Sequence, residues 1–194
     1  GPPSSGGILI AQILNMLEPF NLGAMGWGSA RLTHLVVEAE RRAYADRSVH
    51  LGDPDFWKVP ADKLMDVKYA RERMKDFNPE RATLSHEISA GQWADESEDT
   101  THYSLIDKDG MMVAITTTLN SSCGSQLVIP GTGILMTNEM DDFSAQPGVP
   151  NQFGLLGAEA NAIQPMKRML SSMTPTLVTR DGAPFLITGS PGGS

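Results

Sequence analysis

The stretch Asp99-Thr100-Thr101-His102-Tyr103-Ser104 decides the fold, because the pattern of residue types changes there. Residues 1–99 carry 16 acidic and 11 basic residues, whereas residues 100–194 carry only 7 and 4. The first part therefore predicts solvated helices, and the second part, rich in Thr, Ser, Gly and β-branched residues, predicts strands and loops. Together the two parts predict an α+β chain.

The sequence patterns typical of helices all lie before residue 78. Residues 78–99 are polar and acidic, which indicates an exposed linker. An apolar stretch at residues 8–17 predicts a helix that ends before Pro19. In the helix expected after Ser29, four charged residues should face water: Glu38, Glu40, Arg41 and Arg42. Three further helices have expected starts at residues suited to an N-terminus: Ser29, Pro60 and Asp66.

From His102 onwards the apolar residues recur every second position, which is typical of strands. Two β-hairpins are predicted, with turns at residues 107–110 and 180–182. The Gly-, Pro- and Asn-rich region 120–160 between them predicts a long loop, and loops of this length are usually functional or disordered.

The composition excludes several classes of function. The 23 acidic and 15 basic residues give a formal net charge of −8, which argues against nucleic acid as a partner. The single cysteine, Cys123, rules out an internal disulfide framework. No apolar run approaches the roughly 18 residues of a membrane span. Both ends look cut from a longer protein, so the sequence does not give the cellular compartment.

A cut before Thr100 would create a reactive pair within one residue. The new α-amine would lie beside the threonine hydroxyl, and an amine with a pKa of about 7.7–8.0 accepts that proton near neutral pH. The nucleophile and base of a catalytic triad would thus be combined in Thr100. The alternative from this string alone is a strand that simply begins with threonine.

Several strings of this sequence, including the one at Thr100, resemble the γ-glutamyltransferase family in their order and spacing. The resemblance runs along the whole chain and spans the junction between the family's large and small subunits. The strings are Pro2-Pro3-Ser4-Ser5-Gly6-Gly7, Ala43-Tyr44-Ala45-Asp46-Arg47, Thr100-Thr101-His102-Tyr103-Ser104, Asp107-Lys108-Asp109-Gly110, Asp141-Asp142-Phe143-Ser144, Pro147-Gly148-Val149-Pro150-Asn151, Lys167-Arg168-Met169-Leu170-Ser171-Ser172-Met173-Thr174-Pro175 and Gly189-Ser190-Pro191-Gly192-Gly193-Ser194.

The resemblance implies the N-terminal-nucleophile hydrolase fold, an αββα four-layer sandwich of which this chain holds a part. Residues 1–99 would end the large subunit and residues 100–194 would begin the small subunit. An inactive precursor would cut itself between Asp99 and Thr100. The mature enzyme would transfer a γ-glutamyl group from glutathione or a related amide to water, an amino acid or a peptide.

The resemblance also implies catalytic roles. Thr100 matches the nucleophile, and Thr118 matches a threonine whose hydroxyl orients it. Gly192 and Gly193 match the backbone N–H pair of the oxyanion hole, where glycine permits close approach. Taken alone, Thr118 is an ordinary strand residue and the glycines form a turn or a flexible tail.

Two further groups match the residues that bind the glutamyl end. Asn120, Glu139 and Asp142 would hold its α-amino group, since carboxylates accept hydrogen bonds from an ammonium. Ser171 and Ser172 would donate to its α-carboxylate. Taken alone, the acidic pair is a turn or a helix cap, and the serines belong to a polar linker. The main carboxylate ligand of the family is an arginine further upstream, so no arginine of this chain is assigned that role.

No cofactor is implied, and the scattered histidines lack metal-binding spacing. The implied partners are a γ-glutamyl substrate such as glutathione, an amino acid or peptide acceptor, and the two subunits of one precursor. The resemblance suggests a periplasmic or secreted protein, since family members in bacteria are often so located. One alternative is a cephalosporin-type acylase acting on a glutaryl group, which has no α-amino group for Asn120, Glu139 and Asp142 to bind. Another is a non-catalytic binding or structural piece.

Residues 147–158 match a lid loop that carries Phe153 where many relatives have tyrosine. A phenyl ring can shield the pocket but cannot donate a hydrogen bond across it to Asn120. We expect a looser lid, so Phe153→Tyr should raise the ratio of transfer to hydrolysis. Assays of both products with an acceptor amino acid measure this ratio, and an unchanged ratio would contradict the expectation.

Overall fold

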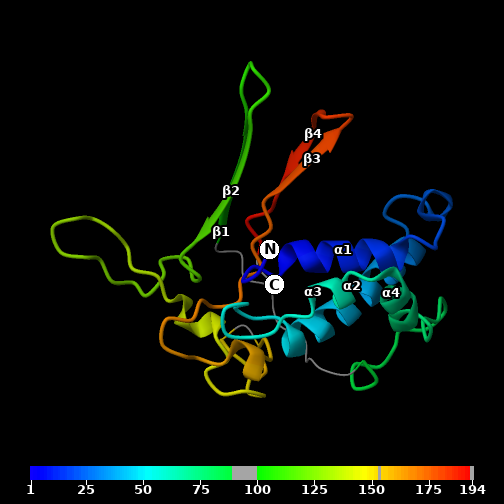
Figure 1. The fold of residues 1–194 in the computed structure, drawn as a ribbon, viewed down its shortest axis with the longest axis horizontal. Helices are drawn as coiled ribbons and strands as arrows, with labels where there is room; N and C mark the ends of the chain where they lie inside the picture. Colours follow the sequence, from blue (N-terminus) through cyan, green and yellow to red (C-terminus); the bar gives the residue numbers. More distant parts are fainter. Residues whose placement is uncertain (89–99, 153, 193–194) are drawn as a thin grey trace.

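The computed structural model describes residues 1–88, 100–152 and 154–192, which form a helical body with two projecting β-hairpins (Figure 1). Its helical elements are α1 (Gly6–Leu17), η1 (Leu22–Met25), α2 (Ala30–His50), α3 (Ala61–Leu64) and α4 (Val67–Arg73). The predicted caps are confirmed. Ser29 Oγ accepts the N–H of Leu32 at 3.1 Å, and Asp66 Oδ1 accepts the N–H of Tyr69 at 3.0 Å.

Two apolar clusters hold the helices together. The first joins α1, α2 and α3 to a residue far along the chain and contains Ile8, Leu9, Ala43, Leu51, Leu64 and Leu170. The second joins α1, α2 and α4 and contains Met16, Leu17, Leu35, Ala39, Ala70 and Met74. Helical spacing of apolar residues in α1 and α2 puts each set on one face. Within the described residues, no helix is long and apolar enough to cross a membrane.

The charged face of α2 differs from the expectation. Glu38 and Arg42 are each only 1% exposed, whereas the sequence predicted that they face water. Arg42 Nη1 donates to Glu38 Oε2 at 2.6 Å, and Thr83 Oγ1 donates to the same oxygen at 2.6 Å. Arg42 Nη2 also donates to Asp76 Oδ1 at 2.9 Å. The segment after α4 covers this face, and the buried charges are stable there because they are paired.

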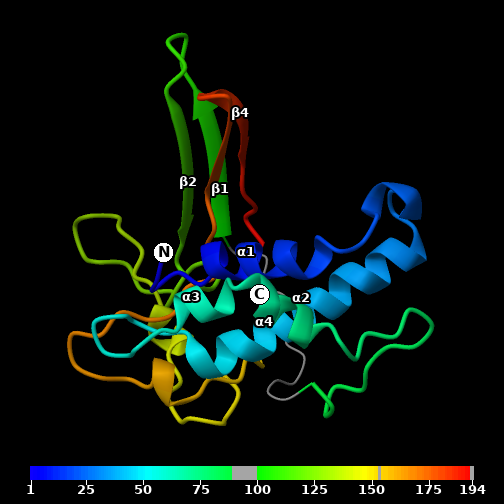
Figure 2. The same cartoon turned by 45° about the vertical axis from the view of Figure 1, so that its right-hand side comes forward.

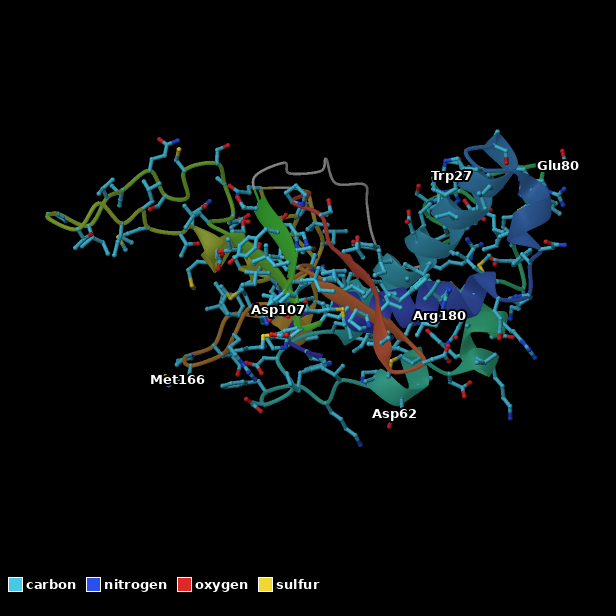
Figure 3. All side chains as sticks on the ribbon, turned by 90° about the horizontal axis from the view of Figure 1, so that it is seen from above. Trp27, Asp62, Glu80, Asp107, Met166 and Arg180 are labelled. Carbon is cyan, nitrogen blue, oxygen red and sulfur yellow. The ribbon has the colours of Figure 1, made fainter. Side chains whose placement is uncertain are left out.

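Both predicted hairpins are confirmed. β1 (Thr100–Ile106) pairs antiparallel with β2 (Met112–Thr118), and β3 (Thr176–Arg180) with β4 (Ala183–Thr188). They project side by side from the same side of the helical body (Figure 2). Seen from above, Asp107 lies in the turn of the first and Arg180 at the end of β3 (Figure 3). The described residues therefore contribute a helical layer and two separate two-stranded sheets to the α+β fold.

In the described part of the long loop between β2 and β3, the helical elements are the short η2 (Glu139–Asp142) and η3 (Glu159–Asn161). Part of it, near residues 121–137, extends away from the body (Figure 1). The remainder folds back beneath the hairpins, where Ala158 N–H donates to Ser48 O of α2 at 3.1 Å. The predicted linker has no helix or strand over residues 78–88, and residues 89–99 lie outside the described part of the chain.

Residues before and after position 100 form one body. Ser5 N–H donates to Ser171 O at 2.8 Å, and Ser171 N–H donates to Pro3 O at 3.3 Å. A second link joins Asp53, which is 0% exposed, to Arg168. The backbone N–H and Nε of Arg168 donate to Asp53 Oδ2 at 2.8 and 2.9 Å, and Nη2 donates to Oδ1 at 2.5 Å.

We expect Asp53→Ala to destabilise the chain by about 2 kcal/mol or more, because several charge-assisted hydrogen bonds disappear. The bonds to Arg168 hold the pKa of the Asp53 carboxyl well below its usual range. Its contribution is therefore fully present above about pH 4 and is lost as the pH falls through the folded-state pKa. Urea unfolding at pH 7 measures the loss.

The matched control is Asp55→Ala. Asp55 contacts the same Arg168 guanidinium at 2.6 Å, but its side chain is 74% exposed. An exposed pair of this kind contributes about 0–1 kcal/mol. Equal destabilisation by the two variants would contradict the role given to the buried carboxylate.

Candidate active site

A cavity of about 360 Å³ lies where the end of α2, the open end of the β1–β2 hairpin, η2 and residues 170–173 meet. Seven of the site residues predicted from the sequence line it: Thr100, Thr118, Asn120, Asp142, Ser171, Ser172 and Gly192. Glu139 is not among its lining residues, and Gly193 and Phe153 lie outside the described part of the chain. Residues separated by up to 145 positions are thus gathered around one space.

Thr100 and Thr118 face each other as register partners at the start of β1 and the end of β2. Residues directly opposite in an antiparallel pair have Cβ atoms about 4.5–5.5 Å apart on one face of the sheet. The hairpin therefore projects both side chains to the same side. Thr118 Oγ1 accepts the N–H of Asn120 at 2.9 Å, which fixes the hydroxyl oxygen of Thr118 at the cavity wall.

Asn120 is buried and adopts a left-handed conformation with φ 78°. Asparagine tolerates this conformation better than most residues. Its Nδ2 donates to Asn138 O at 3.4 Å, and Ser121 N–H donates to Asn138 Oδ1 at 3.1 Å. Asn138 therefore connects the end of β2 to the beginning of η2, so that the amide and the acidic residues share one wall.

The acidic wall is formed by η2. Burial raises the pKa of Asp142 to about 6, and the carboxylates of Glu139 and Asp141 act in the same direction, while Arg47 opposes them. Burial also raises the pKa of Glu139, whose backbone N–H donates to Thr137 Oγ1 at 3.1 Å. A carboxylate whose charge is disfavoured in this way gains from a cationic partner. Asp142 is therefore suited to bind an ammonium group.

A second wall of the cavity carries Ser171 and Ser172, and the structure adds Arg47 to it. Arg47 Nη2 donates to Ser172 Oγ at 2.9 Å, and Nε donates to Ser5 Oγ at 3.0 Å. Burial lowers the pKa of this guanidinium, while Tyr44 and Asp142 raise it. No role was assigned to Arg47 from the sequence, although it ends the string Ala43-Tyr44-Ala45-Asp46-Arg47 that carries part of the family resemblance. Helical spacing was a second signal, since Arg47 lies four residues beyond the buried Ala43.

Gly192 lines the cavity on the side of β4, as the oxyanion-hole prediction requires. Its N–H donates to Ser190 Oγ at 3.1 Å, so an oxyanion would have to replace that contact. The residues that lead from β4 to Gly192 pass close to His102. A Cβ on Gly189 would lie 2.2 Å from His102 Cε1, so glycine is required at this approach.

The predicted lid loop closes one side of the cavity through contacts with η2. Gln152 N–H donates to Asp141 Oδ2 at 3.2 Å, and Asn151 Nδ2 donates to Asp141 O at 3.3 Å. Gln152 Nε2 also donates to Ser121 Oγ at 3.3 Å, beside Asn120. Asn151 and Gln152 thus connect the lid loop to η2 and to the residues that follow β2.

No group of three or more His, Cys, Asp or Glu side chains suited to hold a metal ion occurs within residues 1–88, 100–152 and 154–192. The lining residues are instead two threonine hydroxyls, an acidic wall and a wall of serine hydroxyls backed by arginine. This combination can bind a group that carries both an ammonium and a carboxylate.

Comparison with known proteins places the whole chain in one family. The family model described as gamma-glutamyltranspeptidase matches residues 1–194, as the resemblance predicted. The "Glutathione hydrolase proenzyme" of Escherichia coli (strain K12) is 55% identical over 194 residues, which cover 100% of this chain and 33% of that protein. The "Acylase ACY 1 proenzyme" of Pseudomonas sp. (strain V22) is 40% identical over 191 residues, covering 98% of this chain and 32% of that protein. The chain spans about a third of the length of these curated relatives.

Among solved structures, cephalosporin acylase from Bacillus halodurans superposes with a TM-score of 0.73 and 24% sequence identity. The match covers 96% of this chain and 31% of that chain. The chain therefore shares the fold of that protein, and its helices and strands confirm the predicted α+β class.

We expect Asp142→Asn to stabilise the chain by about 1–3 kcal/mol at pH 7.5, because it removes a partly desolvated charge. The folded-state pKa of about 6 lies above the usual value of an aspartate. The folded state therefore binds the proton more tightly than the unfolded state, and the cost appears as the pH rises from about 4 through 6. Urea unfolding at pH 7.5 and pH 4 should show a gain only at the higher pH. A variant that is less stable than the parent at pH 7.5 would contradict this expectation.

Proposed function

Because the chain belongs to the gamma-glutamyltranspeptidase family, we propose that the protein transfers γ-glutamyl groups from glutathione and related amides, with Thr100 as its nucleophile. The observation that carries this proposal is the composition of the cavity. A candidate nucleophile and both candidate binding walls line the same space of about 360 Å³. Water, an amino acid or a peptide would accept the group.

The charge distribution of the cavity favours the α-amino-acid end of a glutamyl group. Asp142 on one wall accepts from an ammonium, and Asn120 offers an amide beside it. On the other wall, Ser171 and Ser172 donate to a carboxylate with Arg47 behind them. A zwitterion bound between these walls would extend its side chain towards the threonines. We include Glu139 as a residue that adds negative charge near the ammonium.

The proposed reaction begins with attack of Thr100 Oγ on the γ-carbonyl carbon. The free α-amine of Thr100 takes the hydroxyl proton, and Thr118 holds the nucleophile in place. The backbone N–H groups of Gly192 and Gly193 stabilise the oxyanion, and one such donor contributes roughly 2.7–4 kcal/mol in other enzymes. The amine then protonates the leaving nitrogen as the C–N bond breaks. Attack by water or an acceptor amine on the ester releases the product and restores Thr100.

This mechanism requires a cut between Asp99 and Thr100, because an internal threonine has no free amine. The large part, residues 1–99, and the small part, residues 100–194, would then be partners from one precursor. Asp99 lies outside the described residues. Thr100 itself begins β1 and lines the cavity, where the new amine would be formed.

A glutaryl acylase is a second candidate, favoured by the 40% identity to the "Acylase ACY 1 proenzyme" of Pseudomonas sp. (strain V22). The two functions differ in one recognisable group, because a glutaryl side chain lacks the α-ammonium. The acidic wall at Asp142 has a ligand only in the γ-glutamyl reaction. We therefore expect faster hydrolysis of a γ-glutamyl anilide than of the corresponding glutaryl anilide.

The first test is Thr100→Ala in the full-length protein. We expect loss of both precursor cleavage and γ-glutamyl anilide hydrolysis, because the variant has no nucleophile. Intact mass and N-terminal sequencing follow cleavage, and the wild-type protein should give a fragment that begins at Thr100.

Thr100→Ser is the control, since it keeps the hydroxyl and should retain cleavage and measurable activity. Cleavage and hydrolysis that both persist in Thr100→Ala would refute the proposed nucleophile. A wild-type protein that prefers the glutaryl anilide would establish the acylase alternative.

A further inference from the structure

Arg47 is the one cavity-lining cation on the wall of Ser171 and Ser172 among the described residues, and the mechanism above uses it only in outline. It lies in the last turn of α2 and is 8% exposed. A buried guanidinium is costly unless hydrogen bonds and nearby negative charge compensate it. Helix packing alone therefore does not explain why a buried arginine lies beside the cavity.

The hydrogen bonds of Arg47 direct it towards the candidate carboxylate subsite. Nε is anchored on Ser5 Oγ at 3.0 Å, and Nη2 donates to Ser172 Oγ at 2.9 Å. Neither bond uses Nη1. Ser5 is itself fixed, because its N–H and its hydroxyl both donate to Ser171 O, at 2.8 and 2.9 Å. Ser5 therefore holds the guanidinium in place through Nε, and Nη2 is directed at Ser172.

This contact restricts the directions in which the Ser172 hydroxyl can donate. A guanidinium only donates hydrogen bonds, so Ser172 Oγ accepts from Arg47 and its own hydrogen is turned away from the guanidinium. A bond from a charged donor also polarises the hydroxyl and strengthens it as a donor. Both effects favour an anion on the cavity side of Ser172.

We propose that Arg47 is a positioning residue of the α-carboxylate subsite, which holds and polarises Ser172 Oγ so that this hydroxyl donates to the substrate carboxylate. The inference rests on the proposed function and names a residue that acts within it. Arg47 acts through Ser172 and is distinct from a direct carboxylate ligand. The nearby Asp142, which also lines the cavity, favours the charged form of Arg47.

The experiment compares two substrates in the full-length protein: a γ-glutamyl anilide and a 4-aminobutyryl anilide, which differs only in lacking the α-carboxylate. For Arg47→Gln we expect a fall of about tenfold in kcat/KM on the first substrate, mainly through KM, and about twofold or less on the second. Arg47→Lys keeps the charge and should recover part of the loss. Combining Arg47→Gln with Ser172→Ala should cost no more than Ser172→Ala alone, because both variants remove the same interaction.

Arg42→Gln is the matched control. Arg42 is a buried arginine of the same helix whose partners, Glu38, Asp76 and Thr83, lie outside the cavity lining. It should lower stability in urea without changing the ratio of kcat/KM for the two substrates. If Arg47→Gln fails to fold, the comparison is made with Arg47→Lys, whose loss should again be confined to the γ-glutamyl substrate.

Equal losses on both substrates, or additive effects of the Arg47 and Ser172 substitutions, would overturn the positioning role while leaving the proposed function intact. A wild-type protein that is cleaved and folded but inactive on the γ-glutamyl anilide would overturn both. A changed substrate ratio in Arg42→Gln would also count against the proposal, because it would show that any buried charge of α2 affects the site.

Discussion

The backbone bridge between residues 3–5 and 171–173 is the contact on which the cavity depends. Ser5 N–H and Oγ both donate to Ser171 O, and Ser4 Oγ donates to Met173 O at 2.5 Å. The close approach requires glycine at position 6, where a Cβ would lie 1.6 Å from Thr174 Oγ1. This bridge places Ser171 and Ser172 next to the start of α1 and within reach of α2. Without it, Ser171 and Ser172 would not be held against the start of α1 and the end of α2, where Arg47 lies.

The cavity is electrically asymmetric, and this asymmetry has an energetic cost. Burial, together with the carboxylates of Glu139 and Asp141, raises the pKa of Asp142 to about 6, and the buried guanidinium of Arg47 lines another part of the cavity. Desolvated charges of this kind destabilise a fold unless a partner is present. A zwitterionic ligand would supply opposite charges to both walls. The walls are therefore arranged for binding at the expense of folding stability.

Local signals in the sequence predicted the local structure well, and long-range packing limited the rest. The cap at Ser29 and the turn at residues 107–110 depend on neighbouring residues, so their patterns are readable from a short window. The burial of Glu38 and the position of Arg47 depend on segments more than 40 residues away, namely Thr83, Ser5 and Ser172. Helical periodicity identifies the face on which a charge lies, but it does not show what covers that face.

The same distinction applies to the site. Thr100 and Thr118 are brought together by hairpin register, which alternation and the turn already define. The meeting of Asp142 with Ser171 and Ser172 was predictable only through the family resemblance, because a loop and two separate segments bring these residues together. Glu139 shows that a matching position in the sequence does not ensure a place in the cavity lining. It lies outside that lining and raises the pKa of Asp142 electrostatically.

The interactions that shape the cavity also explain how it could survive a break in the chain before Thr100. The links Ser5–Ser171, Asp53–Arg168 and Arg47–Ser172 all join residues before position 89 to residues after position 160. Leu170 packs in the apolar cluster with Ile8 and Leu51, which adds a hydrophobic attachment to these polar ones. None of these contacts depends on a peptide bond at the proposed junction. A cut there would free the amine of Thr100 while leaving both cavity walls attached to each other.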